Sequence, residues 1–178
     1  MKVLKTAALT GIVIAAVVVL ALEPASGAST EWNLADCSKA IIGSGKASWR
    51  AESRSAGPVG VSAAAWAQMW RSPAGEYEVK LPLLVEGQKP VTVSVPPDLR
   101  RRVFLYYGDI VGRDGKPTDS FAEARGYGET EFQPCPDKPR TVWGGGLRIK
   151  GSAPIHLLVH TGGGAAPLPL PLGRPKIH

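Results

Sequence analysis

Two cysteines, Cys37 and Cys135, carry the most definite chemistry in this sequence of 178 residues. In an exported chain, which the N-terminal residues indicate, two cysteines most simply form one disulfide. A metal pair is the alternative, but Cys37 has no second cysteine or histidine at the spacing of metal ligands. We therefore predict a Cys37–Cys135 disulfide. Closing a loop of about 100 residues lowers the entropy of the unfolded chain by the equivalent of about 4–5 kcal/mol.

The histidines are weak candidates for catalysis. His156 and His160 occupy positions i and i+4 of a predicted strand, so about 13 Å separates them and one metal ion cannot bind both. His178 ends the chain. The sequence has no Gly-x-Ser-x-Gly motif, and a disulfide would occupy both cysteines, so no nucleophile stands out. We predict no catalytic residue, no cofactor and no metal site.

Carboxylates occur in pairs on strand patterns. Glu76 with Glu78, and Glu129 with Glu131, stand two residues apart, which is typical of solvated acids on one face of a strand. A glycosidase needs two carboxyl groups that converge in a cleft, and spacing alone does not establish this.

A long polar connection, residues 109–127, also contains acids. Asp109, Asp114 and Asp119 suggest a calcium loop, but their spacing does not match the calcium hand, and the neighbouring Lys116 opposes a cation. A connection of this length is typical of a mobile or functional loop.

Basic residues form the one sequence feature that suggests a binding surface. Arg100, Arg101 and Arg102 are consecutive, and Lys138 and Arg140 lie in a second loop. If both loops lie at the same end of the fold, they can hold an anionic wall polymer or a lipid headgroup. The alternative is a solubilising turn.

Two tryptophans suggest a second kind of site. Residues 62–70 form the one convincing helical segment, with Ser62 as N-cap and Trp66 and Trp70 at i and i+4 on one face. Paired tryptophans can stack on a sugar. The alternative is that they pack over an open end of the core.

The N-terminal residues have the pattern of a targeting signal. Lys2 and Lys5 precede an uncharged apolar run, residues 6–22, and small residues at 25–28 suit a signal peptidase. We predict a signal peptide at residues 1–28 and a single domain at 29–178. The alternative is an uncleaved membrane anchor, for which 17 residues is at the short limit. The formal charge of +6 attracts anionic surfaces, whereas an exported chain without a binding motif is a poor candidate for nucleic acid.

The rest of the sequence is dominated by strand patterns. Tyr77, Val79 and Leu81 alternate with charged residues, and Val91, Val93 and Val95 alternate with Thr92 and Ser94. The turn at 86–89 between them predicts a hairpin. Further strands are predicted at 30–36, 47–53, with Trp49 inward, 57–61, 103–107 and 129–132.

The chain closes on an alternation of proline and leucine at residues 167–172. Polyproline II is one interpretation. We favour a final strand, in which the leucine N–H groups pair with a sheet and the proline side blocks further pairing.

Residues 132–160 contain the second cysteine, a glycine run that allows backbones to approach closely, and a pair of neighbouring strand patterns. The motif F-x-x-C at 132–135, then W-x-G-G-L at 143–147 and a G-x-x-P turn, resembles small exported proteins of actinobacteria that have no assigned function. The segments 90–96 and 102–107 resemble the middle section of the same proteins.

This resemblance covers residues 90–172. It implies an exported sandwich-like domain and brings no catalytic residues. It also implies a cysteine near His156, which this chain lacks, so no second disulfide is expected.

We therefore expect an all-β, immunoglobulin-like antiparallel sandwich of about seven to nine strands with one short helix. The leading functional hypothesis is a non-catalytic exported module that binds or stabilises a wall polymer, a lipid headgroup or another envelope protein. The alternatives are a carbohydrate-binding domain that uses an exposed tryptophan and an envelope hydrolase. A monomer is expected.

Overall fold

A computed structural model of the chain describes residues 31–41, 53–71, 75–112, 114–118 and 123–175. The predicted signal peptide at 1–28 and nearly all of the strand predicted at 47–53 lie outside the described residues.

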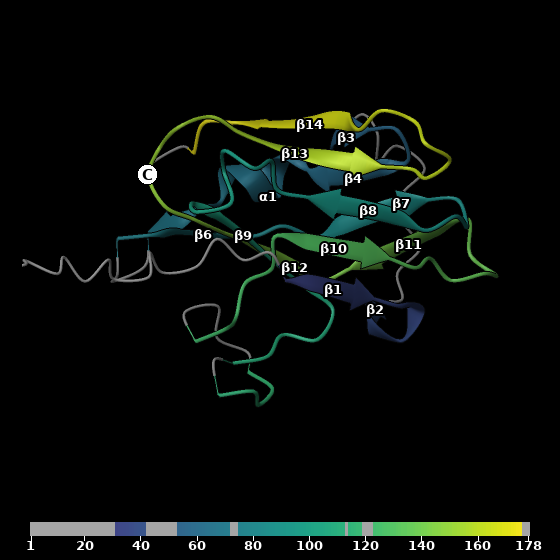
Figure 1. Cartoon of the computed structure of the whole chain (residues 1–178), viewed down its shortest axis with the longest axis horizontal. Helices are drawn as coiled ribbons and strands as arrows, with labels where there is room; N and C mark the ends of the chain where they lie inside the picture. Colours follow the sequence, from purple (N-terminus) through teal and green to yellow (C-terminus); the bar gives the residue numbers. More distant parts are fainter. Residues whose placement is uncertain (1–30, 42–52, 72–74, 113, 119–122, 176–178) are drawn as a thin grey trace, which may run out of the picture.

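The described chain is all-β, with fourteen strands in three sheets (Figure 1). Sheet A has the order β1 (Trp32–Ala35), β10 (Glu129–Phe132), β8 (Val91–Ser94), β13 (Ile155–His160) and β14 (Leu168–Gly173). Sheet B has the order β2 (Ala40–Ile41), β11 (Arg140–Trp143), β7 (Leu83–Glu86), β4 (Val59–Ser62) and β3 (Ser53–Ala56). Sheet C has the order β5 (Trp70–Arg71), β6 (Tyr77–Lys80), β12 (Gly145–Ile149) and β9 (Val103–Tyr107).

Sheet A forms one layer of the molecule, and sheets B and C form the other. Strand β6 continues into β7 through Leu81 and Pro82, and β11 continues into β12 through Gly144, so sheets B and C are two parts of one bent surface. The Leu81 N–H donates to the Gly145 carbonyl at 2.9 Å across the bend. A Cβ at Gly145 would lie 2.2 Å from the Tyr106 carbonyl, so only glycine fits here. The predicted close approach of backbones at the glycine run is thereby confirmed.

The core contains an aromatic cluster with one member from each sheet. Phe132 of β10 packs edge-to-face against Tyr107 of β9 and Trp143 of β11, at centroid distances of 5.3 and 5.1 Å. The polar atoms of the cluster are paired, since the Tyr107 hydroxyl donates to the Leu81 carbonyl at 2.7 Å and the Trp143 indole to the Asp36 carbonyl at 2.9 Å. Complete burial raises the pKa of Tyr107 far above its ordinary value.

The predicted disulfide is confirmed. Cys37 and Cys135 are bonded, with their Cα atoms 4.9 Å apart. Cys37 begins a short 3-10 helix, η1 (Cys37–Lys39), after β1, and Cys135 comes shortly after the end of β10. Because β1 and β10 pair in parallel and the chain passes from each into sheet B, the bond joins two crossings between the layers.

The predicted hairpin across residues 86–89 is wrong. Strand β7 pairs with β4 and β11 in sheet B, whereas β8 pairs with β10 and β13 in sheet A. The connection between them crosses from one layer to the other, and the Gly87 N–H donates to the Pro139 carbonyl at 2.8 Å on the way. Alternation shows which residues face the core, but it does not distinguish strands that pair from strands that face each other. For the same reason the neighbouring patterns of β12 and β13 belong to different sheets.

The predicted C-terminal strand is confirmed. Strand β14 pairs antiparallel with β13 at the edge of sheet A, and its Leu170 and Leu172 are fully buried while Pro169 and Pro171 are exposed. On the outer side of β14, the Arg54 guanidinium donates to the Leu172 carbonyl. Prolines and this arginine together close the edge against further strands.

The fold is a mostly antiparallel sandwich with fourteen strands in the described residues, more than the seven to nine expected. The bend divides two long strands into four, and two further strands, β2 and β5, are only two residues long. The predicted helix is present but short, α1 (Ala63–Ala67), with the Ser62 hydroxyl accepting from the Ala65 N–H at 3.1 Å. Within the described part of the chain, no helix is long and apolar enough to cross a membrane.

Candidate functional site

Trp66 and Trp70, for which a sugar platform and packing over the core were the two interpretations, do not share a face. Trp66 is 2% exposed and belongs to the core, so it cannot contact a glycan. Trp70 lies beyond the end of α1 in edge strand β5 and is 40% exposed. The expected pair fails because α1 ends before Trp70, which removes the helical spacing.

Trp70 begins a row of side chains across the outer face of sheet C. The register places Trp70 opposite Glu78, Glu78 opposite Arg148, and Arg148 opposite Phe104. The Trp70 indole N–H donates to the Glu78 carboxylate at 3.2 Å. We call Trp70, Glu78, Arg148 and Phe104 the covered row, because all but Trp70 are buried.

The charge of Arg148 is compensated within this face. Its Nε atom lies 3.2 Å from a carboxylate oxygen of Glu76, whose other oxygen lies 3.3 Å from the Lys150 ammonium. The guanidinium lies over the rings of Phe104 and Tyr106, at 5.3 and 5.4 Å from their centroids. A cation held by a carboxylate and two aromatic faces is not available to a ligand, and removing it would leave its buried partner uncompensated.

Part of the 109–127 connection covers this face. Ala124 and Ile110 pack with Phe104 and Tyr106 in a second apolar cluster, separate from the main core. A Cβ at Gly126 would lie 2.4 Å from the Phe104 Cβ, so this glycine allows the connection to approach the sheet.

The acids of this connection do not form a metal site within the described residues. Asp109 binds the Lys39 ammonium at 2.6 Å, and no group of three metal-ligating side chains occurs in the part of the chain that the structure describes. The Asp109 carboxylate raises the pKa of Lys39, and a hydrogen bond from the Ser38 hydroxyl lowers the pKa of Asp36. Asp119 lies outside the described residues.

The outer face of sheet A carries a second row, which, like the covered row, starts with a tryptophan opposite a glutamate. Trp32 of β1 is opposite Glu129 of β10, and Glu129 is opposite Ser94 of β8. The Ser94 hydroxyl and the His160 Nε2 lie 2.8 Å apart and share a hydrogen bond. We call Trp32, Glu129, Ser94 and His160 the open row, because Trp32 is 55% exposed and both Glu129 and His160 are partly exposed.

A serine bonded to a histidine is also the arrangement of a nucleophile and its base. Ser94, however, is only 4% exposed, and its buried hydroxyl is hydrogen-bonded to His160. The bond therefore fixes the imidazole ring. The sequence pairs Glu129 with Glu131 and His160 with His156, but it does not bring Glu129 and His160 together, because the row depends on strand order, which the alternation pattern does not contain.

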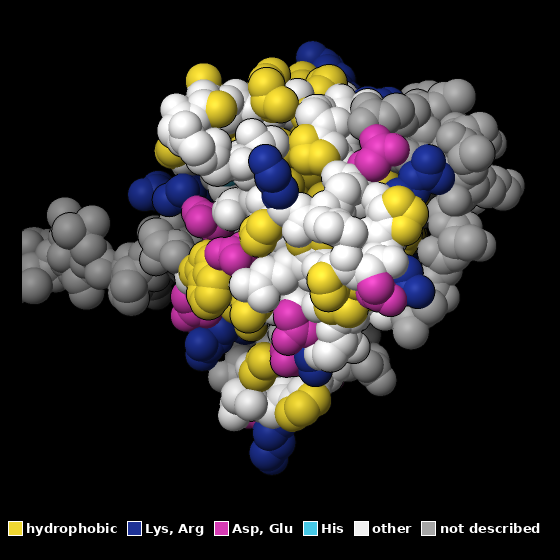
Figure 2. All heavy atoms as spheres, turned by 90° about the vertical axis from the view of Figure 1, so that its right-hand side faces the viewer, with side chains coloured by type: hydrophobic (Ala, Val, Ile, Leu, Met, Phe, Trp, Pro, Cys, Tyr) yellow, Lys and Arg dark blue, Asp and Glu magenta, His cyan; other side chains and the backbone are white. Residues whose placement is uncertain are grey.

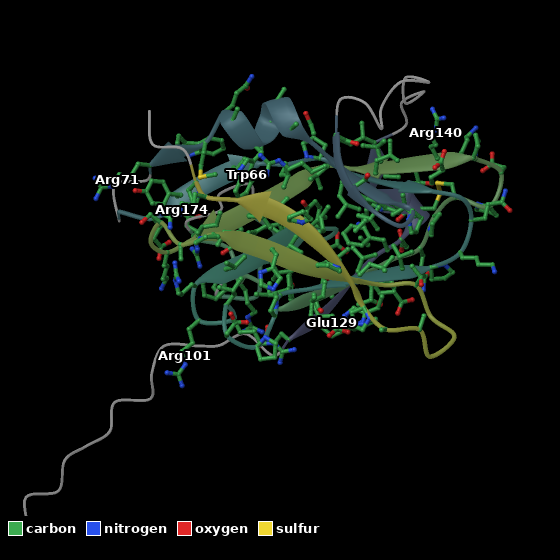
Figure 3. The ribbon with its side chains drawn as sticks, turned by 90° about the horizontal axis from the view of Figure 1, so that it is seen from above. Trp66, Arg71, Arg101, Glu129, Arg140 and Arg174 are labelled. Carbon is green, nitrogen blue, oxygen red and sulfur yellow. A yellow bond between two sulfur atoms is a disulfide. The ribbon has the colours of Figure 1, made fainter. Side chains whose placement is uncertain are left out.

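The two basic loops that could form a joint anion site if they shared one end lie at opposite ends of the molecule. Arg102 is next to Lys150, whose N–H donates to the Arg102 carbonyl at 2.7 Å. Arg140 begins the run of β11 and β12 that ends before Lys150. Figure 3 shows Arg101 and Arg140 at opposite ends, so the condition for a joint anion site is not met.

Two arginines other than the predicted Lys138 and Arg140 lie at the same end as the 100–102 run. Arg71 and Arg174 lie at the same end as Arg101 (Figure 3). We call this set the arginine end, and its members, from three separate segments, are Arg71, Arg100, Arg101, Arg102 and Arg174. Within the described residues, the side chains of Arg71, Arg101 and Arg174 make no ion pair or hydrogen bond, although the Arg71 backbone pairs with β6. The Nε atoms of Arg100 and Arg102 donate to the carbonyls of Val95 and Lys150.

The opposite end has mixed charge. Figure 2 shows lysine and arginine side chains interspersed there with acids and apolar groups. Lys138 lies 3.4 Å from Asp137, and the Arg140 Nε lies 3.7 Å from Glu86. The positive charge at this end is therefore locally compensated.

One hollow lies on the outer face of sheet B, away from both rows. Its lining is mainly apolar and comprises Ser53, Gly60, Val61, Ser62, Pro82, Leu84 and Val142. Two serines and no charged group line it, so it does not bring together an acid and a base.

No known protein family matches this chain, and comparisons with curated proteins and with solved structures also find no match.

Proposed function

We propose that this protein is a non-catalytic module outside the cytoplasm that binds an anionic component of the cell envelope through the arginine end. The observation that carries the proposal is that Arg71, Arg101 and Arg174 lie toward the same end of the molecule, where none of their side chains has a carboxylate partner among the described residues. Uncompensated cations at one end create a positive potential that attracts phosphate or carboxylate polymers and headgroups.

An extracytoplasmic location is supported by two further observations. The Cys37–Cys135 disulfide is of a kind that persists in oxidising compartments. The N-terminal sequence has the basic, apolar and small-residue regions of an export signal. The resemblance of residues 90–172 to small exported actinobacterial proteins agrees with both.

The test compares two triple variants with the same loss of charge. Arg71, Arg101 and Arg174 are changed to Gln in one, and Lys89, Lys138 and Arg140, from the opposite end, are changed to Gln in the other. Retention of the full-length protein is measured on vesicles that contain phosphatidylglycerol and on a purified anionic wall polymer, over a range of salt concentrations.

A cation near an anionic surface contributes about 1 kcal/mol, so the first variant should lose at least about tenfold in affinity on one of the two supports. The second variant should bind nearly as well as the parent. Equal losses in both variants, or retention by the parent that does not weaken with salt, would refute the arginine end as the binding surface.

A further inference from the structure

The outer face of sheet A is a partly exposed, mostly polar surface with an aromatic ring at its edge. Trp32 is the most exposed large apolar side chain of the described residues, at 55%. The pleat directs Trp32, Glu129 and Ser94 to the same side of three neighbouring strands. With about 4.8 Å between strands, the row from Trp32 to Ser94 spans about 10 Å.

A second line of polar groups runs beside the open row. Glu131 of β10 is opposite Thr92 of β8, and Thr92 is opposite His160 of β13. The Gln133 amide donates to the Glu131 carboxylate at 3.0 Å. In the same way, the hydrogen bond between the Ser94 hydroxyl and the His160 Nε2, at 2.8 Å, holds the imidazole ring. Both polar groups are thus held in place before a ligand arrives, which reduces the entropy lost on binding.

Glu129 is the member of the row that has unused hydrogen-bonding capacity. It is partly buried between Trp32 and Ser94, and within the described part of the chain it makes no ion pair or side-chain hydrogen bond. Figure 3 shows it apart from the labelled arginines. A carboxylate is an acceptor for two or more hydroxyl groups, and charged acceptors form the stronger hydrogen bonds.

These groups fit one class of ligand. The face of an indole ring packs against the C–H face of a pyranose, and the carboxylate beside it accepts from the ring hydroxyls. Glu129 and Glu131 repel phosphates and uronic acids, which excludes anionic polymers from this face. We propose that the outer face of sheet A binds an uncharged polysaccharide, with Trp32 as the stacking platform and Glu129 as the principal acceptor. This site is separate from the arginine end and does not depend on it.

The experiment measures retention of the full-length protein on insoluble cellulose, chitin and a neutral α-glucan. The parent should bind at least one of them, and raising the salt concentration should not weaken this binding. Trp32→Ala should reduce the affinity at least about tenfold, as expected for the loss of an aromatic anchor. Trp32→Phe keeps a ring and should recover most of the binding, and Glu129→Gln, which removes the charged acceptor, should lose about threefold or more.

The matched controls lie in the covered row. Trp70→Ala and Glu78→Gln change the same residue types on the other face and should bind polysaccharide as the parent does. Thermal midpoints of all variants establish that each is folded. Binding of none of the three polysaccharides, equal binding by Trp32→Ala and the parent, or a loss with Trp70→Ala as large as with Trp32→Ala overturns the proposal. Salt-sensitive binding to an anionic polymer that persists in Trp32→Ala would instead belong to the arginine end.

Discussion

The open row on sheet A and the covered row on sheet C begin in the same way and end differently. Each starts with a tryptophan on an edge strand opposite a glutamate on the next strand, Trp32 with Glu129 and Trp70 with Glu78. In the covered row, Glu78 accepts a hydrogen bond from the Trp70 indole and is 8% exposed. In the open row the glutamate is partly exposed and makes no such bond within the described residues.

The difference arises from the neighbours of each glutamate on the far side from its tryptophan. On sheet C these neighbours are Arg148 and Phe104, and Ile110 and Ala124 of the 109–127 connection pack in one cluster with Phe104. On sheet A they are Ser94 and Leu158, and the face remains accessible beside them. Two similar edges thus acquire different roles because one face is used to hold a loop. Partly exposed hydrogen-bonding groups without a partner on a rigid sheet are suited to binding a ligand, whereas a buried and compensated ion pair has a structural role.

The largest effect is expected from removing the buried cation of the covered row, Arg148. Arg148→Ala should destabilise the protein by about 3 kcal/mol, because it leaves the Glu76 carboxylate short of a partner and two aromatic rings without their packing. Lys150 retains part of the compensation, which keeps the loss near the lower limit for a broken buried pair. Equilibrium denaturation in urea measures it.

The counterpart on the open face is Glu129→Gln, which should change the free energy of unfolding by less than about 0.5 kcal/mol. If Glu129→Gln costs as much as Arg148→Ala, the open row is also structural and the contrast is wrong.

The second test concerns the loop that covers sheet C. Gly126→Ala would bring a Cβ to within 2.4 Å of the Phe104 Cβ, so the connection must shift away from the sheet. We expect a loss of about 1–3 kcal/mol, typical of overpacking. Relative to the parent, amide hydrogen exchange in this variant should become faster in the connection and should change less in sheet A. Unchanged exchange there would mean that the loop is held by contacts other than the Phe104 and Tyr106 cluster.

The sequence was sufficient for those features that depend on local chemistry. Alternation identified β6 and β8, a continuous apolar run identified β9, the Ser62 cap identified the start of α1, and the leucine-proline alternation identified β14. The disulfide could be predicted from cysteine number and compartment alone. Each of these depends on residues near one another in the chain or on counting.

Features that depend on strand order were not predictable in the same way. The turn at 86–89 has the composition of a hairpin, yet it crosses between layers, because β7 pairs with β4 and β11 whereas β8 pairs with β10 and β13. The arginine end combines Arg71 and Arg174, about 100 residues apart in the chain, with the Arg100–Arg102 run. The open row joins β1 to β10 in parallel, a pairing for which no turn signal exists. Patterning assigns a residue to a face, and only the topology assigns neighbours.

The smallest test compares the two edge tryptophans for stability. Trp70→Ala removes an indole that is 40% exposed and its hydrogen bond to Glu78, and it leaves a buried acceptor without that donor. We expect a loss of about 1–2 kcal/mol. Trp32→Ala removes a ring that is 55% exposed and makes no side-chain hydrogen bond within the described residues, so the loss should stay below about 0.5–1 kcal/mol. Both are measured by urea denaturation of the same preparation. A larger loss for Trp32→Ala would mean that its ring contributes packing to the edge of sheet A, and its exposure would no longer distinguish a binding platform from a structural residue.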